Sequence, residues 1–248
     1  METAINEKEV LRFLGYRGAS ADEKVHSIIA ELIDLFTVNV IPKSVYGVWD
    51  CQIDSSTAVF GGVTVKSKNL ACHLANCRRV VLLAATLGTQ ADMLIRKLSV
   101  QNMEKAVIAQ AVCAAMIEAY CDSITNEIAI HHAETLRRKE SFFNLCASAP
   151  PRETLLQEIE YPTTRFSPGY GDFDIAHQKD ILKILNCSRI GLTLTEGYML
   201  TPSKSVTAIV GLSPKKQRVT QKCERCHTPC ELSPPRSSKR TPRLCAFA

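Results

Sequence analysis

The sequence predicts an α+β body, in which helices pack on a twisted, mainly antiparallel sheet and one helix is long and rich in alanine. Three observations lead to this fold class. Residues 78–88, "RRVVLLAATLG", form the continuous apolar run that is typical of a central buried strand. Residues 204–213, "KSVTAIVGLS", alternate as a strand does. Residues 101–138 contain neither Pro nor Gly and are rich in helix-forming residues.

The first half of the chain combines helix and strand signals. A capping box at residues 20–23 starts an amphipathic helix that is expected to end before Pro42. Residues 44–53 and 58–67 have the pattern of strands, and the second is interrupted by two glycines. Ser67 is expected to cap a short helix that follows it.

The second half is organised around the Ala-rich stretch. A helix is expected to start at Thr89, and residues 101–138 are expected to form one very long helix or two joined ones. Small side chains there let another element approach closely. Residues 172–186 read as a helix capped by Asp172 or Asp174. Strand-like residues follow on both sides of Pro202.

The charge distribution divides the chain into two parts. From Pro214 onward there are nine Lys and Arg against two Glu, which leaves 21 basic and 23 acidic residues in the first 213. Apolar periodicity also stops at Pro214. We therefore predict a folded domain over residues 1–213 and a basic, cysteine-bearing, disordered tail over residues 214–248.

Composition narrows the class of protein. Hydrophobic content of 46% and charged content of 22% are ordinary for a globular protein. The nearly neutral body gives no reason to expect nucleic-acid binding. The apolar stretch at residues 106–121 is shorter than the roughly 20 residues that cross a bilayer, so no membrane partner is expected. The charged N-terminus lacks the apolar stretch of a signal peptide, which predicts a cytoplasmic protein. Its 11 cysteines then indicate free thiols, metal ligands or redox chemistry rather than a disulfide framework.

The segment "RFSPGY", residues 165–170, has the chemistry of a ligand site. Pro168 and Gly169 make a sharp turn with exposed backbone. Arg165 offers a planar cationic fork on one side of the turn, and Tyr170 offers a ring and a hydroxyl on the other. These residues suit a small ligand that has a carboxylate and a flat ring. The alternative is a surface turn with a paired arginine.

This segment resembles the Arg-Pro-Ala-Pro-Gly-Tyr-Pro segment of the activation domain of cobalamin-dependent methionine synthase, which binds S-adenosylmethionine (AdoMet). The Ala-rich helix before it and "GLTLTEGYMLTPSKSVTAIVGLSP" after it, residues 191–214, also resemble that family. The resemblance covers roughly residues 100–214, and it is weaker over residues 5–99.

The resemblance implies a role for each residue of the motif. Arg165 would bind the AdoMet carboxylate, Ser167 and Gly169 would offer backbone groups around Pro168, and Tyr170 would form a wall beside the reactive methyl. An acidic residue shortly before the arginine has its counterpart in Glu160 or Glu158, and an aspartate early in the domain in Asp50 or Asp54.

Three positions depart from the family's segment. Phe166 and Gly171 stand where the family has prolines, and Ser167 stands for an alanine. These departures are expected to make the loop less rigid and to lower affinity through lost preorganisation.

A second candidate site lies in the tail. Cys223, Cys226 and Cys230, with His227 or Cys245, can hold Zn²⁺ tetrahedrally or ligate an iron–sulfur cluster. The alternative is unliganded thiols in a loose tail. The C-x-x-C-H pattern of haem attachment also occurs here, but no signal directs the chain to a compartment where such haems are attached.

The resemblance implies a component of a methyltransferase rather than a complete enzyme. The resemblance implies a free-standing, AdoMet-binding reactivation component that supports reductive methylation of cob(II)alamin in methionine biosynthesis. No Asp-x-His-x-x-Gly cobalt-binding segment occurs in the sequence, so the cobalamin is expected on a partner, a corrinoid-binding methionine synthase or corrinoid protein, together with an electron donor protein. The alternatives are a non-catalytic adaptor or metal-binding redox protein that uses the cysteine cluster, and an independent AdoMet-dependent methyltransferase.

Overall fold

The computed structural model describes residues 5–16, 21–144 and 160–214, with residues 130–144 described by their backbone alone. Its centre is a six-stranded sheet in the order β3-β2-β1-β4-β8-β5, and every pairing in it is antiparallel. The strands are β1 (Lys43–Ile53), β2 (Thr57–Phe60), β3 (Val63–Lys66), β4 (Arg79–Thr86), β5 (Tyr161–Pro162) and β8 (Ser205–Ser213). The predicted α+β class is therefore confirmed.

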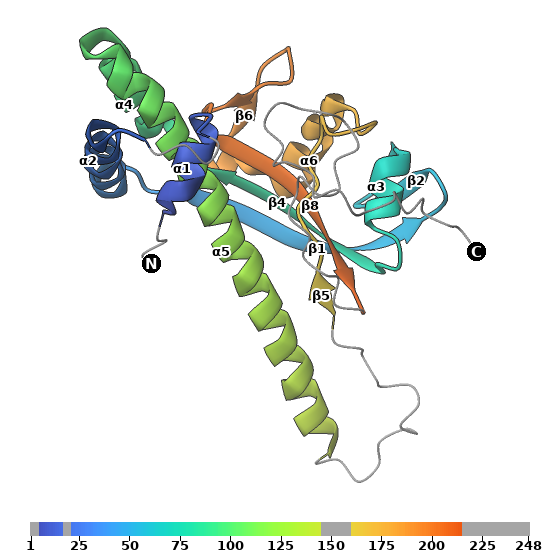
Figure 1. The fold of residues 1–248 in the computed structure, drawn as a ribbon. Coiled ribbons are helices and arrows are strands. Elements are labelled where there is room, and N and C mark those ends of the chain that lie inside the picture. Colours follow the sequence, from blue (N-terminus) through green and yellow to red (C-terminus); the bar gives the residue numbers. More distant parts are fainter. Residues whose placement is uncertain (1–4, 17–20, 145–159, 215–248) are drawn as a thin grey trace, which may run out of the picture.

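Helices surround this sheet, and a small hairpin stands beside it. The helices are α1 (Glu7–Phe13), α2 (Glu23–Asn39), α3 (Lys68–His73), α4 (Thr89–Gln101), α5 (Met103–Asn144) and α6 (Gln178–Leu185), with single 3₁₀ turns η2 (Ile175–His177) and η3 (Cys187–Ile190). The hairpin pairs β6 (Thr193–Leu194) with β7 (Leu200–Thr201). In Figure 1, α5 crosses the sheet and extends well beyond it.

The central strand β4 separates two hydrophobic cores. Val81, Leu83 and Ala85 face the helices α2, α4 and α5, whereas Val80, Leu82 and Ala84 face α3 and α6. All six side chains are fully buried. This double burial explains why the sequence of β4 is continuously apolar instead of alternating, and it confirms the predicted central strand.

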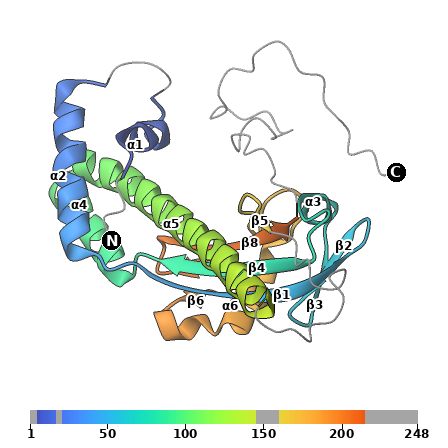
Figure 2. The same cartoon turned by 90° about the horizontal axis from the view of Figure 1, so that it is seen from below.

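The Ala-rich stretch forms one helix, α5, which Figure 2 shows running obliquely across the strands. Its buried alanines let the helix approach the sheet and its neighbours closely: Ala106, Ala109, Ala111 and Ala115. The sequence analysis underestimated the length of this apolar segment, because Met103–Ala129 is long and apolar enough to cross a membrane. Over half of this window is buried inside the protein, as in the core helix of a folded domain.

Two local expectations are modified. Residues 58–67 form a hairpin, β2–β3, instead of one interrupted strand, because Gly61 and Gly62 take positive φ angles of 56° and 77° at its turn. The helix α2 has Asp22 at its N-cap position, whereas the predicted cap, Ser20, lies outside the described residues. Ser67 caps α3 as expected, since its side chain accepts a hydrogen bond from the Leu70 amide.

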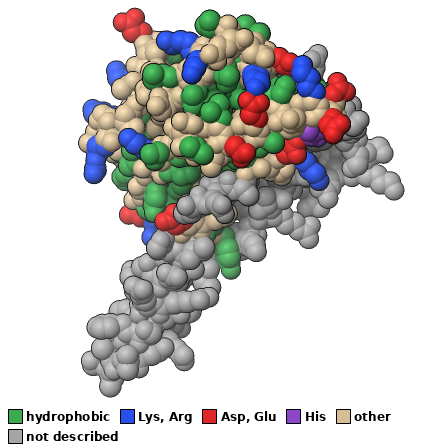
Figure 3. Space-filling view, turned by 90° about the vertical axis from the view of Figure 1, so that its left-hand side faces the viewer, with side chains coloured by type: hydrophobic (Ala, Val, Ile, Leu, Met, Phe, Trp, Pro, Cys, Tyr) green, Lys and Arg blue, Asp and Glu red, His purple; other side chains and the backbone are tan. Residues whose placement is uncertain are grey.

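The surface carries charges of both signs. Figure 3 shows acidic and basic side chains interspersed with apolar ones over one face of the molecule. Exposed ion pairs join α2 to the start of α5, between Lys24 and Glu104 and between Lys105 and Glu31. This mixture agrees with the nearly neutral body that the sequence predicts.

Candidate functional site

The segment of the predicted site runs along the edge of the sheet. Pro162 pairs with Leu212 of β8, and Phe166 exchanges two backbone hydrogen bonds with Ile209, at 2.9 and 2.7 Å. Because side chains alternate along such a segment, Phe166 enters the core on the α6 side while Arg165 reaches towards α5. The edge of the sheet thus fixes the start of the turn.

The turn that follows has the predicted backbone freedom. Gly169 takes a φ of 93°, and its amide donates to the Phe173 carbonyl at 2.8 Å. The Tyr170 amide donates to the Ser167 carbonyl at 3.3 Å. Tyr170 is 66% exposed, which is unusual for a large aromatic side chain. A tyrosine held out from a rigid turn is available to contact a ligand or a partner.

Aromatic packing holds the turn from below. The Phe166 ring lies 5.1 Å from the ring of His73 and 6.2 Å from that of Phe173, between centroids. His73 in turn hydrogen-bonds the Thr164 carbonyl at 2.7 Å through Nε2. Phenylalanine at position 166, where the family has proline, therefore anchors the turn through its side chain.

Asp172 fastens the other end of the turn to α3. Its carboxylate accepts hydrogen bonds from Ser67 Oγ at 2.5 Å, the Lys68 amide at 2.8 Å and the Asn69 amide at 3.1 Å. Desolvation opposes the charged carboxylate, but these hydrogen bonds outweigh it, so the pKa of Asp172 is lowered. Of the two predicted caps, Asp174 is the one that caps the next element, the 3₁₀ turn η2, by accepting from the Ala176 amide.

Gly171 is needed where the family has proline. Its φ is 59°, an angle that proline cannot adopt. A Cβ at this position would lie 2.2 Å from Nδ2 of Asn69. Gly171 thus permits a backbone angle that proline would forbid, and the Asp172 hydrogen bonds hold this end of the turn to α3. The effect of the three departures on affinity stays a prediction.

Arg165 lies between the turn and α5, and only 7% of its side chain is exposed. Nη2 pairs with Glu118 Oε2 at 2.5 Å, and Nη1 pairs with Asp122. Burial alone would lower the pKa of Arg165, but the two carboxylates more than offset it and raise the pKa. The guanidinium is therefore permanently charged. Its role in binding a ligand carboxylate stays a prediction.

The near-complete burial of the Arg165 side chain decides which variants can test its function. In the structure, its removal would leave two carboxylates facing each other across a partly desolvated gap, which costs stability. Variants that keep the positive charge are better tests of its function.

Glu118 and Asp122 are the residues that sequence reasoning missed. They stand four residues apart and thus share one face of α5. Asp122 is 67% exposed, whereas Glu118 is more sheltered. The available signal was weak: an acidic pair at helical spacing in an otherwise apolar, Ala-rich helix. Nothing in the sequence indicated which arginine would meet it.

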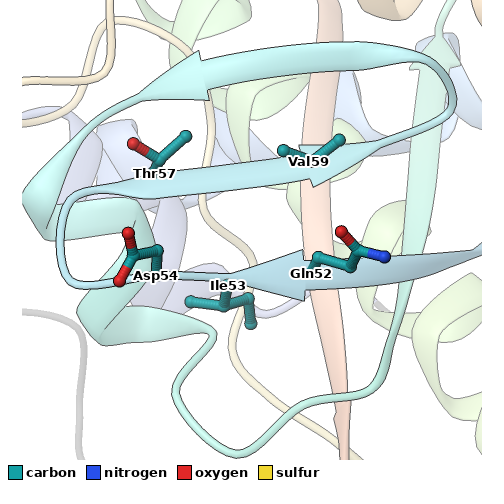
Figure 4. A pocket seen from close by; sticks show the side chains of 5 residues that line it. All are labelled: Gln52, Ile53, Asp54, Thr57 and Val59. Carbon is teal, nitrogen blue, oxygen red and sulfur yellow. The ribbon is translucent and has the colours of Figure 1, made fainter.

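Three of the predicted acidic residues have neighbours other than Arg165, and the fourth, Glu158, lies outside the described residues. Glu160 pairs with Arg79 of β4, and Asp50 lies opposite the same arginine in the ladder between β1 and β4. Asp54 lines an open hollow on the β1–β2 hairpin together with Gln52 and Thr57 (Figure 4). This hairpin lies on the other side of β4 from the Arg165 segment in the strand order. A role of Glu160, Asp50 or Asp54 in ligand binding stays a prediction.

The cysteine cluster Cys223, Cys226 and Cys230 lies outside the described residues. Within the described part of the chain, no group of three or more His, Cys, Asp or Glu residues is placed to hold a metal ion. Burial raises the pKa of Cys113 to about 12 and that of Cys187 to about 11, so both are thiols at neutral pH. Cys113 belongs to the core on the α5 side of the sheet and Cys187 to the core on the α6 side.

A comparison with known protein families identifies the family that includes the elements of the candidate site. The family model described as "Vitamin B12 dependent methionine synthase, activation domain" matches residues 75–223. The chain belongs to this family. The match contains β4, α5, the Arg165 turn and β8, and so it includes both sides of the candidate site.

A solved structure shows the same fold. The chain is similar to the "Crystal Structure of the MetH Reactivation Domain bound to AdoHcy", with a TM-score of 0.59 and 14% identity, over 86% of this chain and 75% of that one. This likeness extends the fold relationship into the N-terminal part that the family model does not match. No curated protein matches the sequence.

Proposed function

We propose that this activation-domain protein binds AdoMet at the Arg165 turn and supports reductive methylation of cob(II)alamin on a corrinoid protein in trans. The observation that carries the proposal is the cluster of Arg165, Glu118 and Asp122 beside the Ser167–Tyr170 turn. The similar MetH reactivation domain was solved with AdoHcy bound, and this supports the choice of ligand.

The cluster suits the amino-acid end of AdoMet. A guanidinium binds a carboxylate through two parallel hydrogen bonds. Asp122 is the more exposed of its two present partners, so the ligand carboxylate would replace Asp122 on Arg165. The released Asp122 carboxylate would then face the ligand ammonium. This exchange leaves every charge paired.

The charge of the cluster also suits the sulfonium. One guanidinium and two carboxylates sum to a net charge of −1, whereas AdoMet carries +1 and AdoHcy is neutral overall. The surplus carboxylate, which we assign to Glu118, would favour AdoMet over AdoHcy by electrostatic attraction. Loss of the methyl would remove that attraction and promote release of the product.

The chain's contribution to the reaction would be positioning. The turn would hold the ligand with its methyl beside Tyr170, on the exposed side where a partner can dock. An electron donor reduces the partner's cob(II)alamin to cob(I)alamin; the S–CH₃ bond then breaks, a Co–CH₃ bond forms, and AdoHcy leaves. The reaction needs no proton transfer from this chain, because the sulfonium is already a good leaving group.

The decisive experiment mixes the protein with its host's corrinoid methionine synthase in the cob(II)alamin state, AdoMet and a low-potential reductant. We expect the visible spectrum to convert to that of methylcobalamin faster than without the protein. The conversion should slow at limiting AdoMet when Arg165→Lys is used. AdoMet binding without any effect on the corrin would favour the adaptor function, and methylation of a small acceptor without corrin would favour an independent methyltransferase.

A further inference from the structure

A second hollow lies next to the turn, between the start of α6, the β6–β7 hairpin and the start of β8. It has a volume of about 250 Å³, and the residues that matter here are Ile175, Gln178, Tyr198, Met199, Ser203 and Ser205. We call it the Gln178 hollow. Ile175 connects it to the turn, since its side chain lies in van der Waals range of a Cβ placed at Gly169.

Gln178 has an unsatisfied polar atom. The residue is only 9% exposed, and its side-chain oxygen Oε1 is buried with no hydrogen-bond partner among the described residues. Leaving a buried acceptor unpaired costs on the order of 1–3 kcal/mol. A side-chain amide rotates easily between two orientations about its last torsion, so Gln178 can present either its oxygen or its nitrogen to the hollow.

The surface around the Gln178 hollow is unusually apolar. Met199 is 65% exposed, and Tyr198 and Ile175 are also exposed large hydrophobic residues, as is Tyr170 on the adjoining turn. Exposed apolar residues gathered around one hollow are typical of a contact surface. A ligand for this surface therefore has an apolar body and at least one hydrogen-bond donor for the Gln178 oxygen.

We propose that the Gln178 hollow receives a side-chain primary amide at the edge of the partner's corrin. A corrin combines an apolar macrocycle with primary amides on its periphery, which is the combination that the hollow requires. With the Gln178 amide rotated so that its oxygen faces the hollow, the corrin amide N–H donates to Oε1, and Ile175, Tyr198 and Met199 cover the adjoining edge of the macrocycle.

The position of the hollow agrees with this assignment, which rests on the proposed function. Ser205, beside the hollow, and Ile209, which pairs with Phe166, are four residues apart on β8, or about 13 Å at the usual strand rise. A corrin centred over Tyr170 therefore extends its edge towards the Gln178 hollow. Gln178 is thus a positioning residue that orients the corrin over the methyl donor.

The test compares two free corrins that differ in hydrogen-bond donors at the edge. Aquacobinamide carries primary amides, whereas its fully methyl-esterified counterpart has the same macrocycle without N–H donors. Equilibrium dialysis, with AdoHcy present to prevent methyl transfer, measures how tightly each is bound by wild type, Gln178→Leu, Gln178→Met and the exposed neighbour control Lys179→Met.

We expect wild type and Lys179→Met to bind cobinamide roughly tenfold more tightly than the ester, as the loss of one hydrogen bond to a buried acceptor implies. Both Gln178 variants should bind the two corrins equally, while their resistance to urea stays equal to or above that of wild type because the unpaired oxygen is gone. Gln178 variants that keep the preference for cobinamide would overturn the proposal, as would a wild-type protein that binds both corrins equally or neither.

Calorimetry with AdoMet on the same samples separates the two proposals. AdoMet binding without a preference for cobinamide would reject only the role of Gln178. Absence of AdoMet binding would reject the proposed function itself. Loss of stability in both Gln178 variants with unchanged cobinamide binding would assign Gln178 a structural role and reject the inference.

Discussion

At the scale of single residues, the candidate site depends on how three charged side chains share their contacts. Arg165 is nearly buried and pairs with two carboxylates of α5. Such an arrangement stabilises the unliganded protein and also prepares the site for a ligand with both an anionic and a cationic group. Binding then exchanges one ion pair for two, so its free energy depends on the geometry of each pair.

Arg165→Lys tests the guanidinium while keeping the charge. We expect AdoMet to bind at least tenfold more weakly, a loss of about 1.4 kcal/mol or more, because an ammonium cannot form two parallel hydrogen bonds to a carboxylate. Calorimetry measures the difference, and the exposed Arg189→Lys serves as the matched control. Equal affinity in wild type and Arg165→Lys would contradict the assignment.

Glu118→Gln tests the response of the site to the sulfonium. We expect the affinity for AdoMet to fall by roughly threefold to tenfold, as for one partly exposed charge pair, while the affinity for AdoHcy changes little. Glu104→Gln is the control, since it removes a carboxylate from the same helix about 21 Å away, at 1.5 Å per residue. A parallel loss of affinity for both ligands would show that Glu118 does not sense the methyl group.

At the scale of elements, the turn is rigid because it is fixed at both ends. The sheet edge holds Phe166, and α3 holds Asp172. Both α3 and the turn are short, and the hydrogen bonds from the Lys68 and Asn69 amides to Asp172 stabilise the backbone of both. The α3 amides would otherwise lack partners at the helix start, and the charged carboxylate of Asp172 satisfies them.

Asp172→Asn should therefore destabilise the fold by about 1 kcal/mol at neutral pH, a modest value because Asp172 is exposed to solvent. The folded-state pKa of Asp172 lies below the ordinary 3.8. Its stabilisation is thus fully present above pH 3.8 and is lost as the pH falls through the folded-state pKa.

Urea unfolding of wild type and Asp172→Asn between pH 7 and pH 2.5 measures this dependence. The difference in free energy of unfolding should shrink towards the acid end of the series. Asp34→Asn, an exposed carboxylate of α2, should show no comparable difference. A gap between wild type and Asp172→Asn that stays constant in acid would mean that the charge of Asp172 is not what stabilises α3.

At the scale of the whole molecule, two hydrophobic cores back the central strands, and the candidate site lies where the edge of the sheet meets α5. Every strand of the six-stranded sheet lies before residue 214. The helices and strands that build the candidate site also lie before this residue, and this motivates a test of whether the tail is separable.

A chain that ends at Pro214 should fold and should bind AdoMet with the affinity of the full chain. Thermal unfolding and calorimetry on the two forms check this. Metal analysis of the full chain, purified without oxygen, tests Cys223, Cys226 and Cys230 separately. Neither zinc nor iron at a stoichiometric level would leave these thiols unliganded, and loss of AdoMet binding on truncation would show that the tail contributes to the site.

The sequence by itself determined the features that short-range patterns encode. The continuous apolar run predicted β4, the absence of Pro and Gly predicted α5, and Ser67 was found as a helix cap. The segment around Arg165 was singled out because Pro168 fixes its own φ and Gly169 permits angles that other residues avoid, which together make a sharp turn. These features depend on neighbours within one or two turns of the chain.

Only the tertiary structure decided which distant side chains meet. Arg165 pairs with Glu118 across 47 residues and with Asp122 across 43, and Asp172 binds Ser67 across 105. The unpaired oxygen of Gln178 likewise follows from how α6 packs beside the β6–β7 hairpin. Each such contact is set by the packing of whole elements on a common sheet, and packing depends on the combined burial of many residues rather than on any local pattern.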